Sequence, residues 1–144
     1  MQVIPESLLE GWKIVVIDDE ADSLEVANII LLEYGADVYT AANGKQGYRL
    51  VRAVRPEFVI SDLSMPEMDG WGFIAEMQKN RELSEIPVIA LTAHGESGDR
   101  KRAINAGFVN YLTKPLTVDT FISDLLLLLE DTPALANKLN TLDR

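Results

Sequence analysis

The sequence predicts a single α/β domain built on a doubly wound parallel sheet of five strands flanked by five helices. Short apolar runs rich in β-branched residues alternate along the chain with segments of helical periodicity, which is typical of consecutive βαβ units. The first run, 13–17, shows no polar alternation, as expected of a strand buried on both faces of a sheet. The length of 144 residues fits one domain, and a hydrophobic fraction of 47% is enough for one sizeable core.

The strands are assigned from these apolar runs and from the residues that end them. The third run leads directly into Asp62, and the fourth ends at Thr92. The expected strands, in chain order, are 13–17, 37–40, 58–61, 87–91 and 108–112.

Helical spacing of apolar residues marks the segments that follow each strand. Gly35, Pro56 and Gly107 are each placed to end a helix. Asn43 is placed to begin the second helix, and Thr117 is placed to cap the last, which runs to about 130. The apolar positions that mark the first four helices are Leu24, Ala27 and Tyr34; Leu50, Val51 and Val54; Phe73, Ile74 and Met77; and Ala103, Ile104 and Ala106.

The composition excludes several classes of function. A net charge of −10 argues against direct binding to nucleic acids or anionic membranes, since both repel an acidic protein. The short basic run 100–102 is interpreted as a solvated helix face. The absence of cysteine excludes disulfides and thiolate chemistry and fits a reducing cytosol. The sequence has neither a signal peptide nor the roughly 18 consecutive apolar residues of a membrane span, so we expect a cytoplasmic protein.

Polar residues follow the carboxyl ends of four predicted strands. Asp18 and Asp19 come after the first strand and Asp62 after the third. Thr92 ends the fourth, and Lys114 follows the fifth. Because ligands of such sheets lie beyond the carboxyl ends of the strands, we expect these side chains to converge at one edge. Crowded carboxylates repel one another unless a cation neutralises them, and a hard divalent ion such as Mg²⁺ does so.

Together these residue types predict phosphoryl-transfer chemistry. Lys114 can pair with a phosphate oxygen, and the hydroxyl of Thr92 can donate a hydrogen bond to another. A carboxylate nucleophile with a metal, a lysine and a hydroxyl catalyses by positioning and by charge stabilisation. Attack of Asp62 on a phosphoryl group would form an acyl phosphate, which is a form of covalent catalysis.

Four segments at predicted strand ends carry a resemblance to one protein family: Ile17–Glu20, Ser61–Gly70, Ala90–Ala93 and Tyr111–Pro115. Through them the chain resembles the receiver domain of bacterial two-component response regulators, over about 13–130. The resemblance implies a flavodoxin-like, CheY-like sheet with strand order 2-1-3-4-5. It leaves 1–12 as an N-terminal extension and 131–144 as a C-terminal tail in which leucines recur at helical spacing.

The resemblance also implies a metal site. Asp62 corresponds to the phospho-acceptor of the family. Asp62 and Asp19 would bind Mg²⁺ (or Mn²⁺) directly, with the backbone carbonyl of Ser64 as the third protein ligand. Asp18 would act through a coordinated water, and no organic cofactor is expected.

A conformational switch is implied in the same way. Thr92 and Lys114 would hold the phosphoryl oxygens, and the Lys114–Pro115 bond resembles one that is cis in the family. Thr92 would move toward the phosphoryl group, and Tyr111 would turn inward into the space that it leaves. That movement would reshape the face of the fourth helix, fifth strand and fifth helix, where a downstream protein or a second copy of the chain would bind.

The leading hypothesis is a stand-alone response regulator that receives its phosphoryl group from a histidine kinase or a histidine phosphotransfer protein. It would be no enzyme but an acceptor that assists its own phosphorylation and dephosphorylation, without direct contact to nucleic acid or membrane. The sequence is also compatible with a piece of a hybrid kinase or larger regulator. One rival is a metal-dependent phosphatase, a class with a second aspartate where this chain has Ser64. The other is a binding module that has lost phosphorylation, against which the complete residue set argues.

Two features are left open by the sequence. His94, two residues beyond Thr92, is either passive or tunes the lifetime of the acyl phosphate. The leucines Leu125–Leu129 cannot all face one core, because consecutive helical positions lie about 100° apart. Either the tail folds back onto them through its own leucines (Leu135, Leu139 and Leu142), or a dimer or partner protein covers them.

Overall fold

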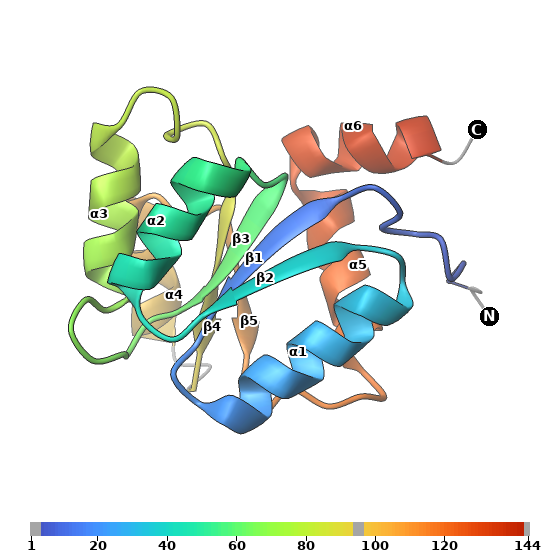
Figure 1. Ribbon diagram of the computed structural model, residues 1–144, viewed down its shortest axis with the longest axis horizontal. Coiled ribbons are helices and arrows are strands. Elements are labelled where there is room, and N and C mark those ends of the chain that lie inside the picture. Colours follow the sequence, from blue (N-terminus) through green and yellow to red (C-terminus); the bar gives the residue numbers. More distant parts are fainter. Residues whose placement is uncertain (1–3, 94–96, 143–144) are drawn as a thin grey trace.

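The computed structural model describes residues 4–93 and 97–142, and within these it has five strands and six helices. The strands form one sheet in the order β2-β1-β3-β4-β5, and all neighbouring pairs are parallel (Figure 1). The predicted fold class and strand order are confirmed, with one helix more than the five expected. The elements are β1 (Lys13–Ile17), α1 (Ala21–Glu33), β2 (Asp37–Ala41), α2 (Gly44–Val54), β3 (Phe58–Asp62), α3 (Gly70–Lys79), β4 (Val88–Thr92), α4 (Ser97–Ala106), β5 (Asn110–Thr113), α5 (Phe121–Asp131) and α6 (Pro133–Leu142).

Helices cover both faces of the sheet, which explains the apolar strands. One face packs against α1 and α5, and the other against α2, α3 and α4 (Figure 1). Within β1, Ile14 and Val16 belong to the first of these clusters, and Val15 and Ile17 belong to the second. Successive side chains of a strand point to opposite faces, so burial of both faces removes the polar alternation from the sequence.

Most helix boundaries follow from the residues that predicted them. Asn43 caps α2, because its side chain accepts a hydrogen bond from the Gln46 backbone N–H at 2.9 Å. Gly35 follows α1 with a φ of 94°, and Gly107 follows α4 with a φ of 119°, a conformation that favours glycine. None of the helices in the described part of the chain is long and apolar enough to cross a membrane.

The predicted cap of the last large helix was wrong. α5 begins at Phe121, and Thr120 rather than Thr117 is its N-cap residue. The hydroxyls of Thr117 and Thr120 lie 2.7 Å apart, so the two side chains bond to each other instead of to a backbone N–H. The residues between them form a turn, which delays the start of the helix.

The tail forms α6, which lies at the amino ends of β1 and β3. Lys138 of α6 pairs with Glu57, the residue before β3, at 3.0 Å. Its ammonium group also lies 5.4 Å from the ring centre of Trp12, the residue before β1. Leu135 and Leu139 are buried in the same cluster as Trp12. Helix α6 therefore covers the end of the sheet opposite the carboxyl edge.

The leucine run of α5 is largely covered by this arrangement. Its buried members are in the cluster that contains Leu135 and Leu139, which is the fold-back considered for the tail. Leu127 is the exception and is 66% exposed. The helical spacing thus buries most of the run and turns one leucine outward.

Leu135→Ala is expected to lower the free energy of unfolding by about 2–4 kcal/mol, because it opens a cavity under α6. Leu127→Ala is the matched control, since it deletes the same atoms from an exposed position, and its effect should stay within about 0.5 kcal/mol. Urea unfolding of the two variants and the wild type measures both values. Equal effects of the two substitutions would show that α6 does not pack against the core through Leu135 in solution.

Candidate functional site

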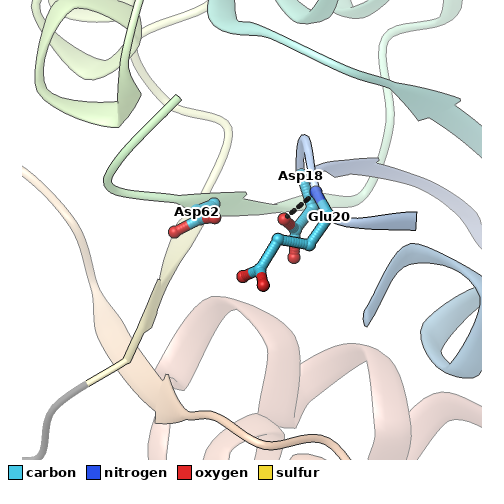
Figure 2. Close-up of side chains that lie close together, drawn as sticks. All are labelled: Asp18, Glu20 and Asp62. Carbon is cyan, nitrogen blue, oxygen red and sulfur yellow. Dashed lines mark hydrogen bonds between the residues drawn. The ribbon is translucent and has the colours of Figure 1, made fainter. Parts of the chain in front are cut away.

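Three carboxylates converge at the carboxyl edge of the sheet. Asp18 follows β1, Glu20 is the N-cap residue of α1, and Asp62 is the last residue of β3. One carboxylate oxygen of each lies within 4.8 Å of those of the other two (Figure 2). Asp18 is 1% exposed and Asp62 is 5% exposed, whereas Glu20 is open to solvent. Two negative charges are thus held close together and away from water.

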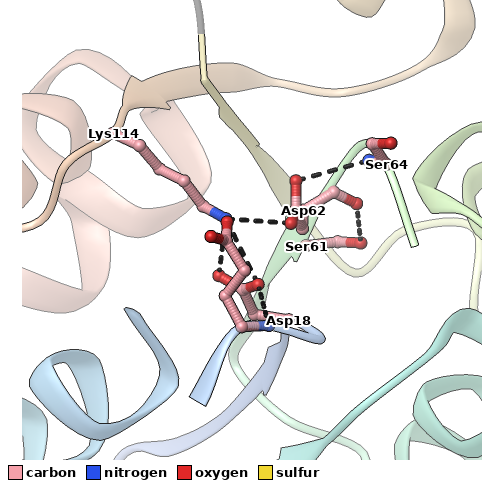
Figure 3. Close-up of polar contacts among 6 residues, drawn as sticks. Asp18, Ser61, Asp62, Ser64 and Lys114 are labelled. Carbon is pink, nitrogen blue, oxygen red and sulfur yellow. Dashed lines mark hydrogen bonds and ion pairs between the residues drawn. The ribbon is translucent and has the colours of Figure 1, made fainter. Parts of the chain in front are cut away.

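Lys114 supplies the positive charge that offsets them. Its ammonium nitrogen lies 2.9 Å from Asp62 Oδ2 and 3.1 Å from Asp18 Oδ2, and it also pairs with Glu20 (Figure 3). The Lys114 side chain is 9% exposed. Its backbone N–H donates a hydrogen bond to the Thr92 carbonyl at 2.8 Å, which holds the end of β5 beside β4. The Lys114–Pro115 peptide bond is cis, as expected.

The carboxylates are also a candidate site for a divalent cation. Carboxylate oxygens are the ligands that Mg²⁺ prefers in proteins. Asp18 Oδ2 is buried and accepts no hydrogen bond, although it lies within ion-pair distance of Lys114. The cluster therefore offers a buried oxygen with unused capacity, and the donor set fits a hard divalent ion.

The environment of the cluster shifts two pKa values. Burial raises the pKa of Asp18 from 3.8 to about 6; the charge of Asp62 adds to this, and hydrogen bonds from the Glu20 backbone and Lys114 oppose it. Burial by itself lowers the pKa of Lys114, but the hydrogen bonds to Glu20, Asp62 and Asp18 outweigh it and raise that pKa above 10.5. Lys114 therefore stays charged at neutral pH, while Asp18 titrates just below neutrality.

In the metal-free protein, Asp18→Asn should raise the free energy of unfolding at neutral pH and change it little near pH 4. The folded-state pKa of Asp18 lies above 3.8, so ionising this carboxyl group costs stability as the pH rises from about 4 through about 6. Above that window the cost is at most about 3 kcal/mol. Urea unfolding of both proteins in EDTA between about pH 4 and pH 7 measures it. A difference that does not vary with pH would contradict the raised pKa.

The loop after β3 holds the backbone close to Asp62. The Ser64 N–H donates a hydrogen bond to Asp62 Oδ1 at 3.3 Å, and the Ser61 hydroxyl donates to the Asp62 carbonyl at 3.0 Å (Figure 3). Gly70 begins α3 directly against this segment. A Cβ at Gly70 would lie 2.2 Å from the Asp62 carbonyl oxygen, so any side chain there would displace the loop.

The structure brings several of the predicted site residues together and leaves others apart. Asp18, Asp62 and Lys114 are in direct contact, and Thr92 is buried in the wall of a pocket that Asp62 also lines. Asp19 is exposed and is not one of the three clustered carboxylates. Direct metal binding by Asp19 and by the carbonyl of Ser64 remains a prediction.

Tyr111 lies on β5, half-buried, and is paired with Ala90 across the sheet. The guanidinium group of Arg100 lies 5.0 Å from the centre of its ring. The inward turn expected of Tyr111 remains a prediction as well. His94, whose role the sequence left open, lies outside the described residues.

Glu20 is the residue that sequence reasoning missed. It belongs to the acidic run 18–20, but no role was assigned to it. Its carboxylate pairs with Lys114, a residue 94 positions away in the chain, and completes the acidic cluster. The uninterrupted run of three acidic residues was the available signal. The basic run 100–102 is exposed as expected, but Arg100 and Arg102 each lie over an aromatic ring.

Comparison with known proteins connects this chain to one family. The family described as response regulator receiver domain matches residues 14–125. An uncharacterized 14.6 kDa protein from Leptolyngbya boryana is 38% identical over 108 residues, which cover 75% of this chain and 82% of that protein. Other relatives are named as transcriptional regulators, and the chain spans about half of their length or less.

Solved structures show the same fold. Chemotaxis response regulator CheY4 of Vibrio cholerae superposes with a TM-score of 0.76 at 24% identity, covering 81% of this chain and 98% of that one. The receiver domain of a sensor histidine kinase from Pseudomonas aeruginosa superposes with a TM-score of 0.74 at 28% identity, covering 85% and 97% of the two chains. That second structure holds a magnesium ion coordinated in its active site cleft.

Proposed function

The chain belongs to the family of response regulator receiver domains, and from this we propose that it is a phosphorylation switch in two-component signalling that accepts a phosphoryl group on Asp62. One observation carries the proposal: at the carboxyl edge of the parallel sheet, Lys114 pairs with three clustered carboxylates, those of Asp18, Glu20 and Asp62. A parallel α/β sheet binds its ligands at this edge. The residues found there are those that phosphoryl transfer to a carboxylate requires.

Asp62 is the nucleophile of the proposed reaction. One of its carboxylate oxygens attacks the phosphorus of a phosphohistidine, and the P–N bond breaks with its electron pair going to the imidazole nitrogen. The donor is a histidine kinase or a histidine phosphotransfer protein. The Ser64 N–H, which donates to Asp62 Oδ1, orients the carboxylate for this attack.

Mg²⁺ (or Mn²⁺) would be held by Asp62 and Asp19 with the backbone carbonyl of Ser64, and by Asp18 through a water. Glu20 is a further carboxylate beside Asp18 and Asp62, and the magnesium ion in the active site cleft of the Pseudomonas receiver domain supports a metal here. When bound, the ion supplies positive charge that offsets the charges of the carboxylates and of the phosphoryl group.

Lys114 and Thr92 would bind the phosphoryl oxygens. Lys114 is already 2.9 Å from Asp62, so a small movement of its ammonium group brings it to an oxygen of the new phosphoryl group. Thr92 is buried beside Asp62 in the same pocket and offers a hydroxyl donor. A phosphoryl group with about two negative charges at pH 7 then favours the arrangement in which both donors face it.

The switch would be transmitted to the face of α4, β5 and α5. Tyr111 lies on β5 two residues before Thr113, which pairs with Thr92 across the sheet. Beside it is a hollow of about 560 Å³ that Tyr111, Arg100 and Leu127 line. A downstream protein in the cytoplasm, or a second copy of the chain, would bind there, and the conformation of Thr92 and Tyr111 would set the affinity.

Measurement of the intact mass after incubation with acetyl phosphate and Mg²⁺ tests the proposal. We expect a gain of one phosphoryl group that disappears when EDTA is present. Rapid hydrolysis could hide the product, so beryllofluoride binding is titrated in parallel by the fluorescence of Trp71, which lines the pocket beside Asp62. No mass gain and no beryllofluoride binding would overturn the proposal in favour of a phosphorylation-independent binding module.

A further inference from the structure

A pocket of about 420 Å³ lies against Asp62, apart from the cluster that contains Lys114. Its lining includes Ser64, Trp71, Thr92 and Arg102. Neither Asp18, Glu20 nor Lys114 lines it. Asp62, the proposed nucleophile, therefore belongs to the acidic cluster and also lines a pocket whose wall contains the cation of Arg102.

Arg102 reaches this pocket from α4 because its guanidinium group stacks on Trp71. The guanidinium carbon lies 4.0 Å from the centre of the indole ring. Trp71 in turn packs edge-on against the buried ring of Phe108, with ring centres 5.9 Å apart, so the support of the guanidinium group is anchored in the core. A stacked guanidinium group still presents its N–H donors at its edges.

The charge of Arg102 is not compensated within the described residues. The ion pairs of that part of the chain involve Arg55, Lys79, Lys114 and Lys138, whereas Arg102 stacks on Trp71. Asp69 also lines the pocket, but its carboxylate accepts the Gly72 N–H at 2.9 Å as the cap of α3. An exposed cation–π contact is weaker than a charge-assisted hydrogen bond, so Arg102 can turn toward an anion.

On the basis of the proposed function, we infer that Arg102 binds the carboxylate leaving group of a small acyl phosphate and so favours acyl phosphates over other small-molecule phosphodonors. In an in-line displacement the leaving group departs on the side of phosphorus away from the attacking Asp62 oxygen. The bond from phosphorus to the acyl oxygen breaks, its electron pair stays on that oxygen, and a carboxylate is released. The negative charge develops on the leaving oxygen, and a guanidinium group in the wall of the pocket beside Asp62 would stabilise it.

Phosphodonors with different leaving groups distinguish binding of the leaving group by Arg102 from binding of the phosphoryl oxygens or support of the fold. Acetyl phosphate releases acetate, whereas phosphoramidate, with its nitrogen protonated, releases neutral ammonia as its P–N bond breaks. Both deliver the same phosphoryl group to Asp62. A residue that binds the leaving carboxylate affects only the first donor, while a residue that binds the phosphoryl oxygens or supports the fold affects both.

The experiment measures the second-order rate constant of phosphorylation by each donor, in Mg²⁺, for the wild type, Arg102→Gln and Arg102→Lys. Arg102→Gln should lower the constant for acetyl phosphate roughly tenfold, as expected for loss of one hydrogen bond to a charged group, and leave that for phosphoramidate within about twofold. Arg102→Lys should recover part of the loss, since it keeps the charge but not the planar fork. Lys101→Gln, an equal change of charge at an exposed neighbour on α4, is the control and should match the wild type with both donors.

Equal losses with both donors, or no loss with either, would overturn the role of Arg102. These outcomes differ from failure of the proposed function, in which the wild type itself gains no phosphoryl group from either donor. Beryllofluoride contains no leaving group, so its affinity for Arg102→Gln, followed by fluorine NMR, should equal that for the wild type. A lowered affinity would assign Arg102 to the phosphoryl group instead.

Discussion

Asp62→Asn is expected to abolish the Mg²⁺-dependent uptake of a phosphoryl group. An amide cannot replace the carboxylate as the nucleophile that forms an acyl phosphate. Of the three clustered carboxylates, Asp62 alone also lines the pocket that contains Thr92 and Arg102. The rate of phosphorylation should fall at least about a thousandfold, which reaches the background of an intact-mass measurement.

The fold of this variant should be preserved, so the loss can be assigned to chemistry. Asparagine has nearly the shape of aspartate and keeps an oxygen that can accept the Ser64 N–H. Asp37→Asn is the matched control, because Asp37 is exposed at the amino end of β2 and should be replaceable without effect. A phosphoryl group found on the Asp62→Asn protein would mean that another side chain is the acceptor.

Lys114→Met is expected to lower the free energy of unfolding strongly in the absence of metal. The substitution keeps the unbranched stem but removes the charge that pairs with Asp18, Glu20 and Asp62. Breaking a buried ion pair from one side costs about 3–5 kcal/mol, so a loss near 3 kcal/mol is expected in EDTA. The pKa of Lys114 is raised above 10.5, so its stabilising charge is retained at neutral pH and is lost only as the pH rises beyond 10.5.

Mg²⁺ should restore much of this loss, and that recovery distinguishes electrostatic repulsion from a packing defect. A ligand that binds only the folded state raises stability with its concentration, and the variant should bind Mg²⁺ more tightly because no ammonium group competes for the carboxylates. Urea unfolding with EDTA or Mg²⁺ and calorimetric titration measure the two effects. Lys79→Met removes an exposed ion pair with Glu76 and should change neither quantity. A loss in Lys114→Met that Mg²⁺ does not reduce would assign it to packing.

The fold was predictable because its determinants are local and repeat along the chain. Both faces of the sheet are buried, so the strands are apolar. Gly35 and Gly107 follow the ends of α1 and α4, Asn43 caps the start of α2, and each acts within one turn of its own position. The site residues Asp18, Asp62, Thr92 and Lys114 were predictable for a related reason. Each lies at or just after a strand end, and parallel strands bring those ends to one edge.

Prediction from the sequence failed for contacts in which a side chain has several possible partners. Thr117 has the chemistry of a helix cap, but its hydroxyl bonds to Thr120 and the helix begins after that residue. The tail leucines fit either a fold-back or a partner contact by periodicity alone. Their burial depends on Trp12 and on α5, which the chain brings together only when folded.

The amino-acid sequence was sufficient to predict the fold class and the polar residues at the carboxyl edge, because these follow from periodicity and from the position of residues at strand ends. The strand order came from the resemblance that the family motifs carry. The folded arrangement was needed to show that Glu20 joins the acidic cluster and that Arg102 borders the pocket beside Asp62. The direction of Glu20 is set by Lys114 from another strand end, and that of Arg102 by the indole of Trp71 on a neighbouring helix. Such contacts depend on distances between elements, and spacing along the chain does not contain them.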